Sequence, residues 1–274
     1  MVRYIPDAVV PAGAPTIAAA DFAPASAPIG SVNALLDRLT GSYGALDRAI
    51  IRSAYNRLQE GGVFALLDTF ATKLGNETDS LLNWTGGPDG TVSGGPVFGA
   101  KGFQLDGLDD YINPNFSRDG AGKYTLTLAH MGAYVSAVPN PDANTMALLG
   151  QSQGSVRVQL YPRNAGPTAA WRVNVDTNTF ATHDRPLTGL WHMGRGIFSG
   201  VATQVLFHGG LNLGQQALSP VGLPPNSVLI GRASSFWPMA ICGWFSGAYI
   251  ATAPRAVLVD VFEMLRAHFV GAIS

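Results

Sequence analysis

The chain has 274 residues, enough for one large domain or for a domain with a substantial appendage. Its net charge is -1 and its 17 basic residues are scattered, so it lacks the electrostatic footprint of a nucleic-acid-binding protein. The single cysteine, Cys242, excludes an internal disulfide framework and a cysteine-clustered zinc site. With 13% charged residues, 33 glycines and 18 prolines, the composition favours a β-rich body with many turns. No apolar run is long enough to span a bilayer and no secretion signal is evident, so we expect a soluble protein without membrane insertion.

Residues 1–30 form an arm dominated by alanine and proline. Five prolines interrupt it, so no helix can run through it and we expect it to be extended. Two alternatives remain, a mobile tail and an arm that lies along another subunit. Docking is favoured by scattered apolar side chains, namely Tyr4, Ile5, Val9, Val10, Ile17 and Phe22.

Residues 31–75 show apolar side chains at helical spacing. Ser31 is a candidate N-cap, and glycine pairs separate three apolar sets that begin at Val32, Leu46 and Val63. The third set comprises Val63, Leu66, Leu67, Phe70 and Leu74. Three short amphipathic helices cannot bury their apolar stripes alone, so the region either packs on the following domain or anchors and oligomerises the protein.

Residues 76–274 change to a period of two, with short apolar runs separated by Gly, Pro, Asn and Asp. The runs are YTLTLAHMGAYV, TMALLG, SVRVQLYP, AAWRVNVDT, VATQVLFHGG, NSVLIGR and WFSGAYIATA. Many short strands with intervening turns indicate a mainly β fold, an antiparallel sandwich or jelly roll. Helical spacing returns in PRAVLVDVFEMLRAHF, which predicts a C-terminal helix starting near Pro254.

The order of several stretches carries a resemblance over roughly residues 77–274. They are LLNWTG, PVFGAKGFQLDGLDDYINPNF, GLWHMGRGIFSG, VLFHGGLNLGQ, NSVLIGR and WFSGAYIATAPRAVLVDVFEML. This order resembles the concanavalin A-like lectin/glucanase and laminin-G-like jelly rolls. Together with the helical stretch that precedes it, the layout is more narrowly similar to virion proteins of tailed bacteriophages and phage-like gene transfer particles.

The resemblance implies an adhesion protein of a virion fibre or spike, made in the bacterial cytoplasm. Its lectin-like sandwich would bind host surface polysaccharide, and residues 1–75 would attach to other virion proteins. A homo-oligomer is expected, with a trimer as one option. Two alternatives stay open: a glycan depolymerase on the same fold, and a capsid decoration protein without a ligand.

Three aspartates in GFQLDGLDDYINPNF raise the question of a metal site. Asp106-Gly107 supplies turn geometry between two alternating segments, so we interpret Asp106, Asp109 and Asp110 as turn formers. Some laminin-G-like domains hold calcium through such oxygens, but DGLDD lacks the acidic ladder of an EF-hand loop. We therefore expect neither a metal nor another cofactor, with calcium as the alternative.

Motifs for catalysis are weak, and we assign no catalytic residue. Glucanases need a carboxylate pair, but Glu60, Glu77 and Glu263 do not form the E-x-D-x-x-E strand motif of this fold. GQSQG around Ser152 matches a nucleophile elbow, yet a strand follows where that motif requires a helix, so we expect a β-hairpin. The histidines have no metal-ligand spacing, and His192 is expected to be structural.

Two stretches could bind a sugar through aromatic faces and directing polar groups. RASSFWPMA offers Phe236 and Trp237, and VQLYPRNAGPTAAWRVN offers Tyr161, Arg163, Asn164 and Trp171, with Arg172 beside them. For each aromatic, burial in the core is the competing interpretation. Trp84, Trp191 and Trp244 lie in apolar runs and are assigned to the core.

Overall fold

The computed structural model describes residues 31–115, 122–139, 145–153, 156–224, 227–232 and 236–271. The predicted extended arm, residues 1–30, lies outside this part of the chain. Within it, no helix is both long and apolar enough to cross a membrane.

The N-terminal helices confirm two of the three predicted helical sets. Helix α1 spans Val32–Arg38, where the Ser31 hydroxyl accepts a hydrogen bond from the Ala34 N–H at 3.3 Å, and α2 spans Ala45–Glu60. The third predicted helix is wrong, because the chain forms a 3-10 turn (η2, Phe64–Leu66) and then strand β1 (Leu67–Thr72). Short apolar runs fit either period, and here pairing with another strand decided the outcome.

A buried aspartate joins the loop after α1 to the short helix α3 (Glu77–Ser80). The Asp79 carboxylate is fully buried and accepts five hydrogen bonds. The donors are the Thr40 N–H and hydroxyl, the Gly41 N–H, the Tyr43 hydroxyl and the Asn76 amide. Although burial opposes ionisation, these donors hold the pKa of Asp79 below its usual value.

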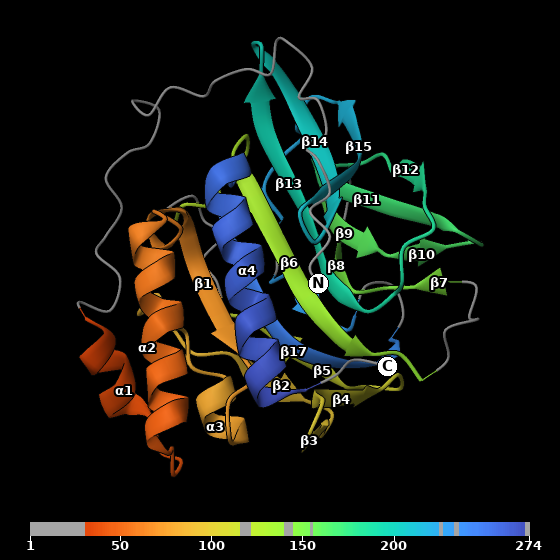
Figure 1. Ribbon diagram of the computed structural model, residues 1–274. Coiled ribbons are helices and arrows are strands. Elements are labelled where there is room, and N and C mark those ends of the chain that lie inside the picture. The colour runs from red at the N-terminus through yellow and green to blue at the C-terminus, as the bar shows by residue number, and fades with distance from the viewer. Residues whose placement is uncertain are drawn as a thin grey trace, which may run out of the picture.

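Sheet A has eight antiparallel strands and forms the middle layer of the molecule (Figure 1). Its order is β15 (Leu211–Ala217), β14 (Val201–His208), β13 (Gly189–Phe198), β6 (Ala129–Ala137), β17 (Pro238–Gly247), β4 (Gly102–Asp106) and β3 (Val97–Gly99). Strand β17 pairs with β4 through its first half and with β1 through its second half. Residues 67–72 therefore belong to sheet A.

Sheet B has seven antiparallel strands. Its order is β12 (Thr179–Thr182), β11 (Thr168–Val175), β9 (Val156–Tyr161), β8 (Leu149–Gln153), β16 (Leu229–Ile230), β5 (Tyr111–Asn113) and β2 (Thr91–Ser93). A small sheet of β7 (Thr145–Met146) and β10 (Arg163–Asn164) stands beside it. The prediction of a mainly β, antiparallel jelly-roll sandwich with a short helical region is confirmed.

The space between the two sheets holds one hydrophobic core. Trp171 comes from sheet B, and Trp191 and Trp244 come from sheet A; all three are at most 2% exposed. Their size fills the space between the layers, as expected for indole rings in a dry interior. The assignment of Trp191 and Trp244 to the core is confirmed.

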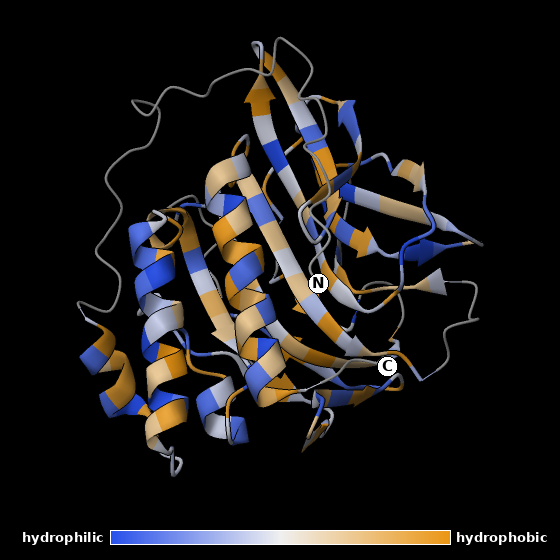
Figure 2. Cartoon of the chain, in the orientation of Figure 1, coloured by the Kyte–Doolittle hydropathy of each residue, from blue (hydrophilic) through white to orange (hydrophobic). Residues whose placement is uncertain are grey.

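The outer face of sheet A is covered by helices, so the molecule has three layers. Helix α4 (Thr252–Phe269), the predicted C-terminal helix, lies beside α2 over β1 and β6 (Figure 1). The Phe262 ring of α4 lies 4.9 Å from that of Phe70, and the Trp84 ring lies 5.2 Å from Phe70 in the same cluster. Both long helices have a hydrophilic and a hydrophobic side (Figure 2). Most of the apolar side chains of α1 and α2 are thus buried within the chain, although Leu46 is 65% exposed. Their role in anchoring or oligomerisation stays a prediction.

Candidate ligand-binding face

The outer face of sheet B, turned away from sheet A, carries a row of polar side chains. Val158 and Leu160 point into the inter-sheet core, so the alternating residues Arg157, Gln159 and Tyr161 of β9 point outward. On the neighbouring strand β11, Arg172 lies directly opposite Gln159. Two arginines, an amide and a phenol are therefore gathered on two adjacent strands.

This row contains polar atoms that are buried but have no hydrogen-bond partner. Gln159 is 2% exposed and Arg172 is 7% exposed. Gln159 Oε1, Arg172 Nε and Arg157 Nε all lack a partner, although Arg172 Nη1 donates to the Asp176 carbonyl at 2.9 Å. Burial first, and then the neighbouring Arg157 charge, lower the pKa of Arg172. Buried polar groups without partners are rare in proteins, and an ordered water, an ion or a bound molecule can complete their hydrogen bonding.

The second predicted sugar-binding stretch is divided by the pleat of the sheet. Tyr161 lies on the outer face, is 8% exposed and packs with Ala147 and Ala170. Arg163 and Asn164 form β10 and pair with β7. Trp171 is wrong as a ligand-binding residue, because its fully buried side chain points into the core. Its neighbour Arg172 takes the outward position.

The first predicted stretch forms a separate aromatic cluster near β5. The Arg232 guanidinium lies 4.9 Å from the Phe236 ring centre and 5.3 Å from that of Tyr111, in the geometry of cation–π contacts. Phe236 and Trp237 are half-buried, and Trp237 packs against the inter-sheet core. Tyr111 follows the same outward phase as Tyr161, but three strand spacings separate β5 from β9, roughly 14 Å. The structure therefore does not bring the two predicted stretches into one site, and Phe236 and Trp237 stay predictions.

The acidic stretch forms a corner between the two sheets. Strand β4 belongs to sheet A and β5 to sheet B, so the turn is a crossover rather than a hairpin. Asp110 accepts a hydrogen bond from the Asp106 N–H at 2.9 Å, which confirms its role in shaping the turn. Burial, followed by the neighbouring carboxylates of Asp106 and Asp109, raises the pKa of Asp110. Oxygens of all three lie within 4.8 Å of one another, so this corner could hold a cation.

Ser152 and the three glutamates lie on separate elements of the fold. GQSQG begins within β8, and Ser152 pairs with Arg157 of the following strand β9, so the predicted hairpin is confirmed. Glu60, Glu77 and Glu263 lie on helices α2, α3 and α4, away from the faces of sheet B.

His192 is structural, as predicted, and belongs to a buried pair that the sequence did not indicate. His130 and His192 are fully buried on neighbouring strands, with His130 Nε2 and His192 Nδ1 2.8 Å apart. The Ile250 N–H donates to His130 Nδ1 at 3.1 Å, so His130 donates from Nε2 to His192, which in turn donates to the Gly209 carbonyl at 2.7 Å. All four ring nitrogens are satisfied only while both rings are neutral. Burial lowers the pKa of His192 to about 3 and that of His130 far below its usual value.

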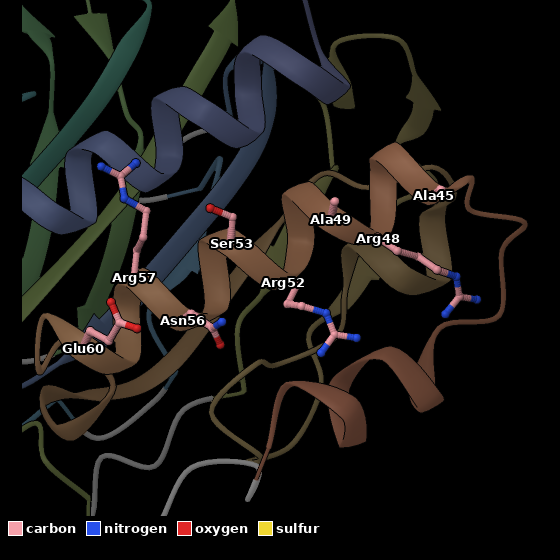
Figure 3. Close-up of a pocket in the computed structure, with 8 residues that line it drawn as sticks. All are labelled: Ala45, Arg48, Ala49, Arg52, Ser53, Asn56, Arg57 and Glu60. Atoms are coloured by element: carbon pink, nitrogen blue, oxygen red, sulfur yellow. The ribbon is translucent and has the colours of Figure 1, made fainter.

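A second basic surface lies on the exposed side of α2 (Figure 3). A shallow, open hollow runs along the helix and is lined by Ala45, Arg48, Ala49, Arg52, Ser53, Asn56, Arg57 and Glu60. Arg52 donates to Asn33 at 3.0 Å, and Arg57 lies 3.9 Å from Asp260. These arginines extend into solvent from one helix, unlike the buried arginine of sheet B.

Comparisons with known proteins support the fold. No family model and no curated protein matches the chain. Among solved structures, the receptor-binding domain of botulinum neurotoxin C/D mosaic serotype aligns over 72% of this chain and 51% of its own, with 10% identity and a TM-score of 0.57. The botulinum neurotoxin serotype D binding domain aligns over 71% and 50%, with 8% identity and a TM-score of 0.50.

A mutant of Trypanosoma rangeli sialidase displaying trans-sialidase activity aligns over 79% of this chain and 39% of its own, with 12% identity and a TM-score of 0.51. The chain thus spans about half the length of the neurotoxin domains and less of the sialidase. At these identities the likeness shows the fold alone, an antiparallel β-sandwich of the jelly-roll class.

Sequence reasoning named Arg172 beside the predicted aromatic residues but missed Arg157 and Gln159 as candidate ligand contacts. The signal was present in VRVQLY, where polar and apolar residues alternate and one face must collect Arg, Gln and Tyr. The prediction rested on the aromatic residues instead, and the face that each aromatic occupies depends on the pleat of the sheet.

Proposed function

We propose that this protein is a carbohydrate-binding adhesion protein and that the outer face of sheet B is its glycan site. The observation that carries the proposal is the group of buried, unpartnered polar atoms of Gln159, Arg172 and Arg157 beside Tyr161. A sugar presents hydroxyl groups that satisfy such atoms and C–H surfaces that pack on aromatic rings. Because the face belongs to a rigid sheet, these groups are held in place before a ligand arrives.

Two kinds of comparison support this proposal. Solved structures with the same sandwich include receptor-binding domains and a sialidase, which by their descriptions recognise receptors or act on sialic acid. The order of sequence stretches resembles virion proteins of tailed phages and gene transfer particles. The finer proposal is a fibre or spike that attaches to other virion proteins through residues 1–75 and to host surface polysaccharide through the sandwich. A homo-oligomer would strengthen weak sugar contacts by multivalency.

We further propose that the protein binds without cleaving its ligand. The helical positions of the three glutamates and the hairpin at Ser152 favour binding over hydrolysis. The alternative, a depolymerase, would release new reducing ends from a polysaccharide.

The test is a glycan array probed with the full chain and with two matched variants. Gln159→Leu replaces the buried amide by an apolar group of similar size, and Gln59→Leu makes the same change at an exposed position of α2. We expect Gln159→Leu to lose binding while Gln59→Leu and thermal unfolding stay close to the unaltered chain. Binding that survives Gln159→Leu would remove this face from consideration, and an array without any bound glycan would refute the function. A reducing-end assay on each bound polysaccharide tests the absence of cleavage.

A further inference from the structure

The outer face of sheet B carries two arginines that form no ion pair with another described residue. Arg157 and Arg172 are diagonal neighbours on β9 and β11, roughly 7–8 Å apart at their Cα atoms, and their guanidinium groups can reach a common ligand. Asp176 accepts a hydrogen bond from Arg172 through its backbone carbonyl, and its charge raises the pKa of Arg172 by less than burial and Arg157 lower it. The guanidinium groups of Arg157 and Arg172 repel each other, and the repulsion is stronger at low solvent exposure. An anion bound between them would replace this repulsion by attraction.

The unpartnered atoms specify more than charge. Arg157 Nε and Arg172 Nε are hydrogen-bond donors, whereas Gln159 Oε1 between them is an acceptor. A bare inorganic anion satisfies the two donors but repels the amide oxygen. A carboxylate that is part of a hydroxylated ring satisfies all three atoms, because the carboxylate accepts from the arginines and a hydroxyl donates to Gln159.

The other polar surfaces of the sandwich fit an anion less well. The cluster of Tyr111, Phe236 and Arg232 lies beside the acidic corner at Asp106–Asp110, which repels a negative group. The arginines on α2 extend into solvent, where pairing with an anion is screened and weak (Figure 3). The low exposure of Gln159 and Arg172 makes each hydrogen bond on sheet B stronger than one in water.

We propose that the outer face of sheet B recognises the carboxylate of an acidic sugar, with Arg157 and Arg172 donating to the carboxylate and Gln159 accepting from a ring hydroxyl. This inference rests on the proposed glycan-binding function and names the class of its ligand. Arg157 is half-buried and marks the side from which the carboxylate enters.

The experiment measures binding of the full chain to polygalacturonate, alginate and hyaluronate, and to the carboxyl-reduced form of each. We expect at least one acidic polymer to bind and its reduced form to bind about 10- to 100-fold more weakly, the loss expected for charge-assisted hydrogen bonds. Raising the salt concentration from 50 to 500 mM should weaken binding of the acidic polymer only modestly, because buried ion pairs are screened less than exposed ones. Binding to the exposed arginines of α2 would instead weaken steeply over this range.

Matched variants locate the binding. Arg157→Met and Arg172→Met should each reproduce the effect of carboxyl reduction, and Arg48→Met and Arg52→Met on α2 should leave binding unchanged. Thermal unfolding of each variant identifies any that fail to fold, and Arg172→Lys, which keeps the charge but loses the planar fork, gives a second measurement.

Three outcomes overturn the inference. Equal binding of reduced and unreduced polymers, or binding confined to neutral glycans on the array, would refute acidic-sugar recognition while leaving the glycan function standing. Loss of binding in the α2 variants alone would assign the anion to the other surface. If neither these polymers nor any array glycan binds, the proposed function itself fails.

Discussion

The buried pair His130–His192 makes a prediction about acid stability. The two rings are neutral in the folded protein, because protonating either one removes an acceptor from the relay between the Ile250 N–H and the Gly209 carbonyl. The pKa of His192 is about 3 in the folded state against 6.5 for an unperturbed histidine, and that of His130 is shifted in the same direction. At pH values between these two pKa values the unfolded chain binds more protons than the folded chain, so acidification favours unfolding. The contribution is complete above about pH 6.5 and is lost as the pH falls toward 3.

The magnitude follows from proton linkage. Lowering the pH from 7.5 to 5.5 costs about 1.4 kcal/mol of unfolding free energy for each histidine that stays neutral, and about 2.7 kcal/mol for the pair. With a urea dependence of roughly 2–3 kcal/mol per M, the unfolding midpoint moves by roughly 1 M. Urea titrations at the two pH values, followed by tryptophan fluorescence, measure this shift.

The control is the double variant His130→Asn and His192→Gln. The asparagine oxygen replaces Nδ1 as acceptor for Ile250, and the glutamine amide replaces Nε2 as donor to Gly209, but neither titrates in this range. His208, whose pKa is also lowered by burial, is retained in both proteins, so the difference between them isolates the pair. On lowering the pH from 7.5 to 5.5, the decrease in unfolding free energy should be about 2.7 kcal/mol smaller for the variant than for the unaltered chain. Equal losses in the two proteins would refute the neutral relay.

Two further predictions concern the turn and the buried carboxylate. Gly107 has φ +80, and an added Cβ would lie 2.5 Å from Pro238, so Gly107→Ala should lower the unfolding free energy by about 2 kcal/mol or more. Gly62 has φ +68 but open space around it, so Gly62→Ala should lower it by about 1 kcal/mol. Guanidinium unfolding compares the two, and equal losses would contradict the close approach at the corner. Asp79→Asn replaces one carboxylate oxygen by an NH2 group, which faces hydrogen-bond donors that then lose their acceptor. It should lower the unfolding free energy by about 3 kcal/mol. The control Asp37→Asn, at an exposed position, should change it by less than about 0.5 kcal/mol. Urea titration at neutral pH checks both, and a small effect at Asp79 would show that the loop rearranges.

The proposed glycan site lies on the surface of a sheet. Its polar groups come from the alternation of β9 and from one residue of β11, and the backbone pairing fixes their spacing. The aromatic cluster around Arg232 lies toward the opposite edge of the same sheet. A polysaccharide that follows the sheet could contact both, and comparing Phe236→Ala with Gln159→Leu on the array would measure their separate contributions.

Local sequence determined much of this protein. Alternation in VRVQLY fixes Arg157, Gln159 and Tyr161 on one face of a strand, whatever that strand packs against. The stripes that begin at Val32, at Leu46 and near Pro254 determined three helices, and the Asp-Gly pair at 106 and 107 determined a turn. Each of these patterns has a period or a backbone preference that neighbours along the chain alone can express.

Tertiary structure decided the features that depend on distant partners. Residues 67–72 fit a helical period but became strand β1, because pairing with β17 and burial between the helices and the sandwich outweighed it. The turn at Asp106 was predicted between two alternating segments, but only the tertiary structure decided that it passes from one sheet to the other. Trp171 faces the core and Arg172 faces outward because the register with β9 sets the pleat, and the histidine relay exists because β6 and β13 are neighbours. These outcomes follow from long-range packing and strand pairing, whose free energies exceed local preferences and are not written in any short segment.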